Sequence, residues 1–185
     1  GWNSYASIIL RELDKYLVKG SEITVVADES FRESVEACCS RNDKQLYFKT
    51  GDTTSRVLLD QLKIADFDHV IVLAATTLNT QEADARTLVT LLHLRDISVQ
   101  DETPFSIVSE MLDLHNRDLA TITRVDDFIV SAHLISLMIA QLSENGHLME
   151  VFTDMLNEDG AEINLKPAEE YVVPGEAVNF YTIVE

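Results

Sequence analysis

The sequence has few of the residues that mark extracellular or nucleic-acid-binding proteins. Its two cysteines, Cys38 and Cys39, are adjacent. This spacing fits neither a C-x-x-C motif nor a zinc site, so we expect reduced thiols and a cytosolic setting. Lysine and arginine number 14 against 32 acidic residues, which gives a formal charge of −18. Such a chain repels phosphate backbones and anionic lipid, and we expect no nucleic-acid partner.

Long apolar runs and catalytic signatures are also scarce. No stretch approaches the roughly 18–20 apolar residues of a membrane-spanning helix. The sequence does not begin with Met, so we expect a fragment without a signal peptide, with any membrane part outside it. The five histidines lack the spacing of a metalloenzyme, and there is no G-x-S-x-G, P-loop or kinase motif. We therefore expect that the chain is not an enzyme.

What the sequence does contain is an alternation of strands and helices. Apolar residues make up 46% of the chain, enough for a folded core. The alternation predicts a Rossmann-like α/β fold, with a parallel sheet covered by helices on both faces. The predicted strands are 23–27, 45–49, 70–75, 105–109 and 127–130, and the predicted helices are 3–18, 30–40, 53–62, 81–94 and 115–122. We expect Ser30, in a capping box with Glu33, and Thr53 or Thr54 to cap two of these helices.

After residue 132 the chain changes character. The predicted helix 133–143 is apolar almost all round, so it must be buried on more than one side. In a chain of this length a second subunit is the natural second surface. We therefore expect a homo-oligomer, with helix 133–143 in a dimer interface or against helix 147–156 of a second subunit.

The last residues predict a small β appendage, because apolar positions alternate at 161–165 and again at 178–184. The expected organisation is thus a Rossmann-like lobe at 1–132, a helix-turn-helix of interface or crossover helices at 133–156, and the β appendage at 157–185.

The first residues have the frame of the dinucleotide fingerprint G-x-G-x-x-G/A, written here Gly1-Trp2-Asn3-Ser4-Tyr5-Ala6. Asn3 replaces the second glycine, the one that lets the backbone approach a pyrophosphate. Its side chain can cap the helix instead. The helix N-terminus still attracts an anion, but tight NAD binding is disfavoured.

Two further turns carry candidate ligand-binding residues. Asp28 ends the strand 23–27, where a carboxylate holds ribose hydroxyls in dinucleotide-binding folds; the alternative is a capping or solvated acid. Gly51 permits a tight turn, and Asp52 or Thr53 follows it at the carboxyl end of a strand, either as a cap or beside a ligand. The candidate cofactor-binding residues are Gly1, Trp2, Asn3, Asp28, Gly51, Asp52 and Thr53.

Three segments resemble the regulator-of-K⁺-conductance domain (RCK, or TrkA-N-like): GWNSYASIILRELDKYLVKGSEITVV, GDTTSRVLLDQLKIADFDHVIVLA and FSIVSEMLDLHNRDLA. More narrowly, Gly1-Trp2, VDDFIVSAHLISLMIAQLSEN and EDGAEINLKPAEEYV…NFYTIVE are similar to ion channels of the CASTOR/POLLUX kind. The resemblance covers the whole chain. It implies a cytosolic, ligand-sensing domain of a potassium or calcium-linked cation channel. Copies of such a domain assemble into a gating ring below the pore domain of the full-length channel.

The resemblance also implies ligands, because RCK domains bind nucleotides or Ca²⁺. Glu110 matches a carboxylate that binds Ca²⁺ in some of them, although Leu112 stands where a second carboxylate is expected. The candidate metal ligands are therefore Asp28, Asp52 and Glu110, with Ca²⁺ as the metal. Two alternatives stay open: a soluble NAD-binding, TrkA-like subunit of a K⁺ transporter, and an NAD(P)-dependent oxidoreductase. Both need an intact glycine motif.

The position of the fingerprint raises a question about the sheet. In dinucleotide-binding folds it follows a central first strand. The sequence begins at Gly1, so we expect this strand to be missing between strands 23–27 and 70–75. We expect the slot to be closed by direct pairing of those strands, or by the tail Val178–Val184 from the same chain or a partner.

Overall fold

The computed structural model describes residues 2–39, 45–100, 105–116, 127–157, 160, 167–173, 175 and 177–179. The chain divides into two units, Gly1–Ser143 and Glu144–Glu185. The boundary between them falls within the predicted helix-turn-helix segment, 133–156.

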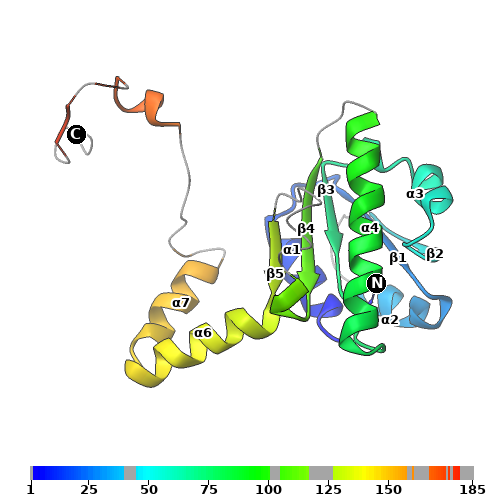
Figure 1. Cartoon of the computed structure of the whole chain (residues 1–185), viewed down its shortest axis with the longest axis horizontal. Helices are drawn as coiled ribbons and strands as arrows, with labels where there is room; N and C mark the ends of the chain where they lie inside the picture. Colours follow the sequence, from blue (N-terminus) through cyan, green and yellow to red (C-terminus); the bar gives the residue numbers. More distant parts are fainter. Residues whose placement is uncertain are drawn as a thin grey trace. The chain divides into compact units, whose positions relative to one another are not determined.

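The first unit is an α/β fold whose described strands form two parallel sheets (Figure 1). In one sheet, β1 (Glu22–Ala27) pairs with β2 (Gln45–Thr50). In the other, the order is β3 (His69–Val72), β4 (Ser106–Met111) and β5 (Asp127–Val130). All three ladders are parallel, and the predicted Rossmann-like class is confirmed.

The helices of this unit follow the predicted alternation. They are α1 (Ala6–Tyr16), α2 (Arg32–Glu36), α3 (Arg56–Leu62), α4 (Thr80–Gln100) and α6 (Ser131–Glu144). Short 3₁₀ turns occupy Glu29–Phe31, Ala37–Cys39, Ile64–Asp66 and Leu114–Asn116. Most of the helix predicted at 115–122 lies outside the described residues.

The larger core lies between α3, α4 and the sheet β3-β4-β5. Helix α4 extends six residues beyond its predicted end, because apolar residues on its inner face continue to Ile97. Leu91 and Leu94 of this helix are almost fully buried, and they pack with Ile107 of β4 and Leu59 of α3. Burying a leucine of this kind contributes about 1.5–3 kcal/mol.

A second core joins α1 and α2 to the sheet β1-β2. Trp2 and Ala6, at the start of α1, cluster with Ala27 at the end of β1 and Val35 of α2. Leu73, which follows β3, packs against the same cluster. Side chains from the beginning of the chain thus share one cluster with the end of β1 and with the segment that follows β3.

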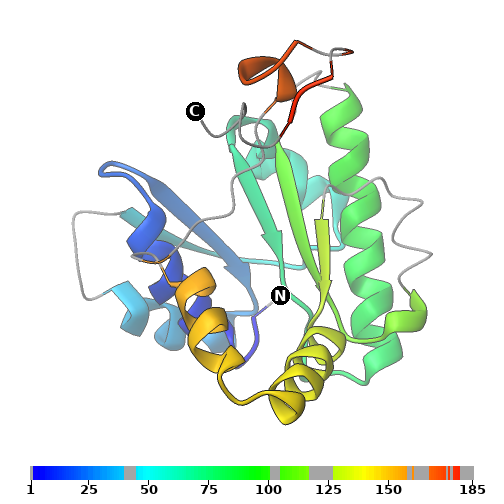
Figure 2. The same ribbon diagram turned by 90° about the vertical axis from the view of Figure 1, so that its left-hand side faces the viewer.

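Those contacts bear on the predicted closure of the sheet. Among the described strands, β1 pairs only with β2, and β3 pairs only with β4, so the expected direct pairing of β1 with β3 is wrong (Figure 2). The physical reason is the side-chain packing of Trp2 and Ala6, which joins the two sheets without a shared ladder. The alternative filler, Val178–Val184, lies mostly outside the described residues.

Two predicted helix caps are also wrong. Asp28, not Ser30, caps the turn after β1, because its carboxylate accepts hydrogen bonds from the backbone N and the hydroxyl of Ser30. Asp52 does the same for Thr54, and α3 begins only at Arg56, with Ser55 at its N-cap position. In both turns the carboxylate of an aspartate after the strand accepts these hydrogen bonds, and the predicted serine or threonine cap donates them.

The second unit contains α7 (Leu148–Leu156) and a 3₁₀ turn at Ala168–Glu170. The predicted strand at 161–165 lies outside the described residues, and so does most of that at 178–184. Val178 and Asn179, which are described, have no strand assignment. Within the described part of the chain, no helix combines the length and the apolar character needed to cross a membrane.

Candidate ligand-binding site

A cavity of about 600 Å³ lies in the first unit, where β1, β2 and β3 end and α4 begins. This is the crevice in which open α/β sheets bind ligands, and the volume is in the range of small-molecule sites. Its walls combine apolar residues with hydroxyl and charged side chains. The lining includes Trp2, Ala27, Asp28, Ser30, Thr50, Gly51, Asp52, Thr53, Ala75, Thr77, Arg86, Thr87 and Thr90.

Most of the predicted cofactor-binding residues meet in this cavity. Trp2, Asp28, Gly51, Asp52 and Thr53 all line it, although they come from three separate segments of the chain. The strand ends bring them together, because parallel strands finish at the same edge of the structure. Gly1 lies outside the described residues.

Asp28 forms one acidic wall of the cavity. Its Oδ1 accepts hydrogen bonds from the hydroxyl of Ser30 at 2.6 Å and from the backbone N of Ser30 at 2.9 Å. These two bonds hold the pKa of the Asp28 carboxyl below its usual range. Asp28 is therefore ionised at neutral pH and brings a negative charge to the cavity.

Asp52 faces the cavity from the turn after β2. Its Oδ1 accepts hydrogen bonds from the backbone N of Thr54 at 3.0 Å and its hydroxyl at 2.8 Å, and it forms an ion pair with Arg86 Nη2 at 2.6 Å. The Thr54 bonds, followed by the positive charge of Arg86, lower the pKa of Asp52. The pair ties the turn to α4 at the cavity's edge.

Gly51 lies close to the side chain of Leu58, which would have to shift to admit a Cβ at this position. A Cβ at this position would lie 2.5 Å from Leu58 Cδ2 of α3. The backbone N of Gly51 also donates to the carbonyl of Ala27 at 3.1 Å, which joins the ends of β1 and β2. Gly51 thus lets α3 pack closely against the turn that carries Asp52.

The α4 side of the cavity was not predicted from the sequence. Arg86, Thr87 and Thr90 line it, and Thr90 also donates a hydrogen bond to the carbonyl of Arg86 at 2.9 Å. Polar residues recur here on a helix face that is otherwise buried, and Thr87 and Thr90 are almost fully buried. That pattern is a usable signal, but it identifies a site only once α4 is placed beside the strand ends.

Asn3 and Glu110 form a polar cluster behind the cavity wall. Asn3 is almost fully buried, and its Nδ2 donates to Glu110 Oε2 at 2.8 Å and to the carbonyl of Ala74 at 3.0 Å. Its Oδ1 accepts a hydrogen bond from the backbone N of Tyr5 at 3.0 Å. The predicted cap of α1 by Asn3 is wrong, because Tyr5 holds the N-cap position and Asn3 stabilises the turn before the helix. The amide thus occupies the place where a glycine would admit a pyrophosphate.

The three predicted metal ligands are only partly brought together. Asp28 and Asp52 line the cavity, whereas Glu110 does not and instead accepts hydrogen bonds from Asn3, Ala74 N and Ser131 Oγ. In the described part of the chain, no three His, Cys, Asp or Glu side chains form a group that could hold a metal ion. A cation in this cavity would need ligand hydroxyls or water to complete its coordination.

Comparison with known proteins finds relatives that are similar over the whole of this chain. No family model matches the chain. It is 26% identical to the probable ion channel POLLUX of Arabidopsis thaliana, 27% to the ion channel DMI1 of Medicago truncatula and 24% to the probable ion channel CASTOR of Oryza sativa subsp. japonica.

Each alignment covers all of this chain but only 27%, 25% and 25% of the respective relative. The chain therefore spans about a quarter of the length of these curated relatives. Over its full length it is similar to part of the ion channels of the CASTOR and POLLUX kind, which confirms the narrower resemblance expected from the sequence.

Proposed function

We propose that this chain is the cytosolic, ligand-sensing gating domain of a CASTOR/POLLUX-like cation channel, and that it is not an enzyme. The cavity at the strand ends carries the proposal, because it gathers ionised Asp28 and the Asp52–Arg86 pair around a hydroxyl-rich floor. The full-length similarity to ion channels supports the same conclusion. In this role, ligand binding favours one arrangement of the domain and so biases the pore.

The chemistry of the cavity favours a small polar or cationic ligand over NAD. The formal charge of −18 and the carboxylates of Asp28 and Asp52 attract cations. The buried Asn3 amide and the Glu110 carboxylate disfavour a pyrophosphate at the start of α1. Ca²⁺ is accordingly the first ligand to test.

The same observation separates the proposal from its alternatives. A soluble TrkA-like subunit and an NAD(P)-dependent oxidoreductase both require close approach of the dinucleotide to the fingerprint. The Asn3 side chain occupies that approach and is held there by hydrogen bonds of both its Nδ2 and its Oδ1 atoms. We therefore expect neither copurified nor added NAD(H) to bind tightly.

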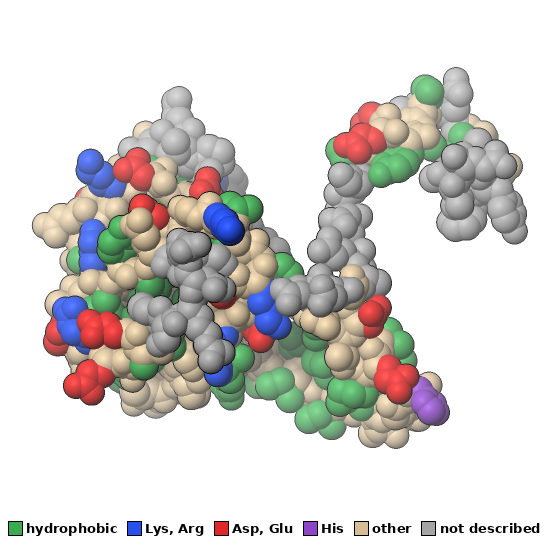
Figure 3. Space-filling view, turned by 180° about the vertical axis from the view of Figure 1, so that it is seen from behind, with side chains coloured by type: hydrophobic (Ala, Val, Ile, Leu, Met, Phe, Trp, Pro, Cys, Tyr) green, Lys and Arg blue, Asp and Glu red, His purple; other side chains and the backbone are tan. Residues whose placement is uncertain are grey.

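Assembly through α6 completes the proposed function. All residues of this helix are described and none is buried in the single chain, with Leu134, Ile135, Leu137 and Ile139 at least half exposed. Figure 3 shows the apolar side chains on this surface. Exposed apolar patches of this kind are typical of protein–protein interfaces. We propose that α6 packs against a second copy, as a dimer or within a gating ring attached to a pore domain.

The ligand proposal can be tested by thermal unfolding of the chain in millimolar CaCl₂. A ligand at 100 times its dissociation constant adds about 2.7 kcal/mol, which raises the midpoint by roughly 5–11 °C in a chain of this size. We expect Ca²⁺ to raise it in the wild type, and Asp28→Asn with Asp52→Asn to remove the rise. Glu33→Gln, an exposed carboxylate outside the cavity, is the matched control. A midpoint unchanged by Ca²⁺ but raised by NAD⁺ would favour the TrkA-like alternative.

A further inference from the structure

Glu110 connects three segments of the chain through one carboxylate. It lies near the end of β4 and is partly buried. Its Oε2 accepts hydrogen bonds from Asn3 Nδ2 at 2.8 Å and from the backbone N of Ala74 at 3.1 Å. Its Oε1 accepts one from Ser131 Oγ at 3.3 Å. The carboxylate therefore links the start of α1, the segment after β3 and the first residue of α6.

Two of these segments continue directly into the walls of the cavity. Trp2 precedes Asn3, Ala75 follows Ala74, and both Trp2 and Ala75 line the cavity. Asn3 and Ala74 are also bonded to each other, through Asn3 Nδ2 and the Ala74 carbonyl at 3.0 Å. A ligand that displaces either wall must therefore move a donor to Glu110 Oε2.

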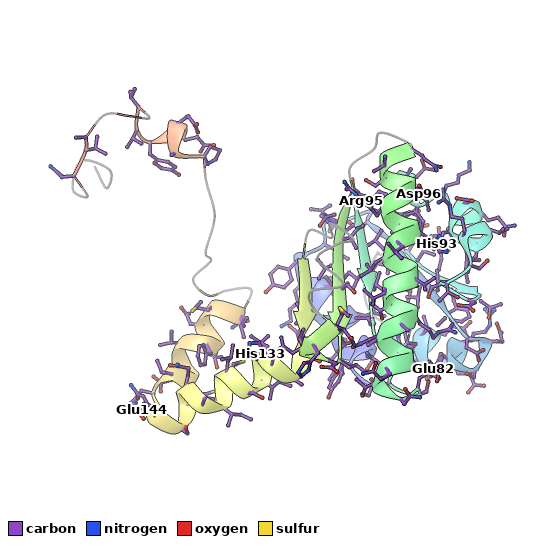
Figure 4. The ribbon with its side chains drawn as sticks, viewed as in Figure 1. Glu82, His93, Arg95, Asp96, His133 and Glu144 are labelled. Atoms are coloured by element: carbon purple, nitrogen blue, oxygen red, sulfur yellow. The ribbon has the colours of Figure 1, made fainter. Side chains whose placement is uncertain are left out.

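The third segment is held much less firmly. Helix α6 follows β5 without a break, and none of its residues is buried in the first unit. Ser131 is its first residue, so the bond to Glu110 fixes the start of the helix. A carboxylate near this end also interacts favourably with the helix dipole. In Figure 4, His133 and Glu144 mark the two ends of α6.

We propose that Glu110 is a positioning residue that couples the ligand cavity to α6. Its two oxygens belong to one planar group, so a rotation that follows the donors on Oε2 also moves Oε1 away from Ser131. Loss of the Asn3 or Ala74 bond thereby loosens the first turn of α6, and loss of the Ser131 bond loosens the start of α1. The use of this coupling in gating rests on the proposed function, whereas the coupling itself does not.

Hydrogen exchange of the ligand-free chain, read by mass spectrometry, tests this link. Asn3→Ser removes the amide donor but keeps an oxygen that can accept the hydrogen bond from the backbone N of Tyr5. Residues that share a hydrogen-bond network change each other's equilibria by at least about twofold, and this coupling is reciprocal. We therefore expect Asn3→Ser to speed exchange in the first turn of α6 by about threefold. Ser131→Ala should speed exchange at the start of α1 by a similar factor.

Two further variants make the result specific. Ser136→Ala removes a hydroxyl of α6 that donates only to the carbonyl of Ala132, so it is the matched control and should leave α1 unchanged. In a Glu110→Ala background, Asn3→Ser should no longer affect α6. If Asn3→Ser unfolds the chain, the effect of Ser131→Ala on exchange in α1 is sufficient to test the proposal. Ser131 is not buried, so this substitution should leave the chain folded.

The proposal is overturned if Asn3→Ser changes exchange in α1 while α6 exchanges as in the wild type, or if Ser131→Ala acts on α6 alone. Both exchange measurements use the chain without a ligand and without a pore domain. A failure here would therefore leave the proposed gating function standing, and a failure of the calcium test would leave this coupling standing.

Discussion

Asp84 offers a quantitative test of how the turn after β4 is held. It lies on α4 with no exposed surface, and its carboxylate accepts three hydrogen bonds. They come from the backbone N atoms of Leu112 at 2.9 Å and Asp113 at 3.0 Å, and from Asn116 Nδ2 at 2.8 Å. Asp84→Ala would leave all three donors without this acceptor.

The expected cost follows from these contacts. Hydrogen bonds to a charged group contribute about 1.5–3 kcal/mol each. The sum is reduced because removal of Asp84 also removes a buried charge that is costly to desolvate. It is reduced further because the donors are only partly buried and can bind water. We therefore expect a loss of about 3 kcal/mol, which lowers the unfolding midpoint by roughly 6–12 °C in a chain of this length.

Circular dichroism during thermal and urea unfolding measures this loss. Asp84→Asn keeps the shape and one acceptor but turns an N–H₂ group toward a backbone donor, so it should fall between wild type and Asp84→Ala. Glu33→Ala removes the same charge at an exposed position and should change stability by less than about 0.5 kcal/mol. If Asp84→Ala is as stable as Glu33→Ala, the carboxylate does not hold the turn as described.

Three further predictions concern other parts of the chain. Arg56 pairs with Asp60 within α3 and with Asp96 near the end of α4, which is labelled in Figure 4. Because both partners are largely exposed, Arg56→Ala should cost only about 1 kcal/mol in a urea titration. Ile139→Asp on α6 should convert a dimer or larger assembly to monomer in sedimentation velocity while the far-ultraviolet circular dichroism stays that of the folded chain, and an unchanged sedimentation coefficient would contradict the proposed interface. Asp52 has a lowered pKa in the folded chain, so its stabilising effect is present above the unfolded carboxyl pKa of about 3.9. This effect is lost as the pH falls through the folded value. The difference in unfolding midpoint between wild type and Asp52→Asn should therefore be constant near neutral pH and vanish in acid.

Periodicity in the sequence was sufficient to predict most of the described helices and strands of the first unit. The apolar runs at 23–27 and 127–130 correspond to β1 and β5, and the predicted helix 81–94 is α4. Such runs are local, so their type follows from spacing alone. The turn chemistry was predicted less well, because Asp28 and Ser30 are both good caps and only the backbone geometry decides between them.

The candidate site was predicted where it follows from strand ends and, for Trp2, from the frame of the fingerprint. Asp28 and Asp52 each follow a strand, and parallel strands place such residues at one edge. Arg86 lies on α4, and nothing in the local sequence marks it as a site residue. Its pairing with Asp52 depends on how α4 packs. Glu110 was predicted as a metal ligand by resemblance, but its bond to Asn3 joins residues 107 positions apart and has no local signal.

The slot between β1 and β3 shows the limit of reasoning from backbone pairing alone. Unpaired strand edges are costly, so closure of the two strands was expected. In the structure, Trp2 and Ala6 pack in one cluster with Ala27 at the end of β1, Leu73 of the segment after β3 packs against that cluster, and the strands stay in separate ladders. Packing of a tryptophan near the start of the chain cannot be derived from the pattern of the strands.

The central claim is that occupancy of the cavity controls a channel. It is tested most directly by single-channel currents of the full-length channel that contains this segment, recorded in planar bilayers with Ca²⁺ added to the side that bears it. Asp28→Asn combined with Asp52→Asn should abolish the calcium dependence of the open probability and leave the unitary conductance unchanged. A calcium response that is the same in this double variant and in the wild type would contradict the claim.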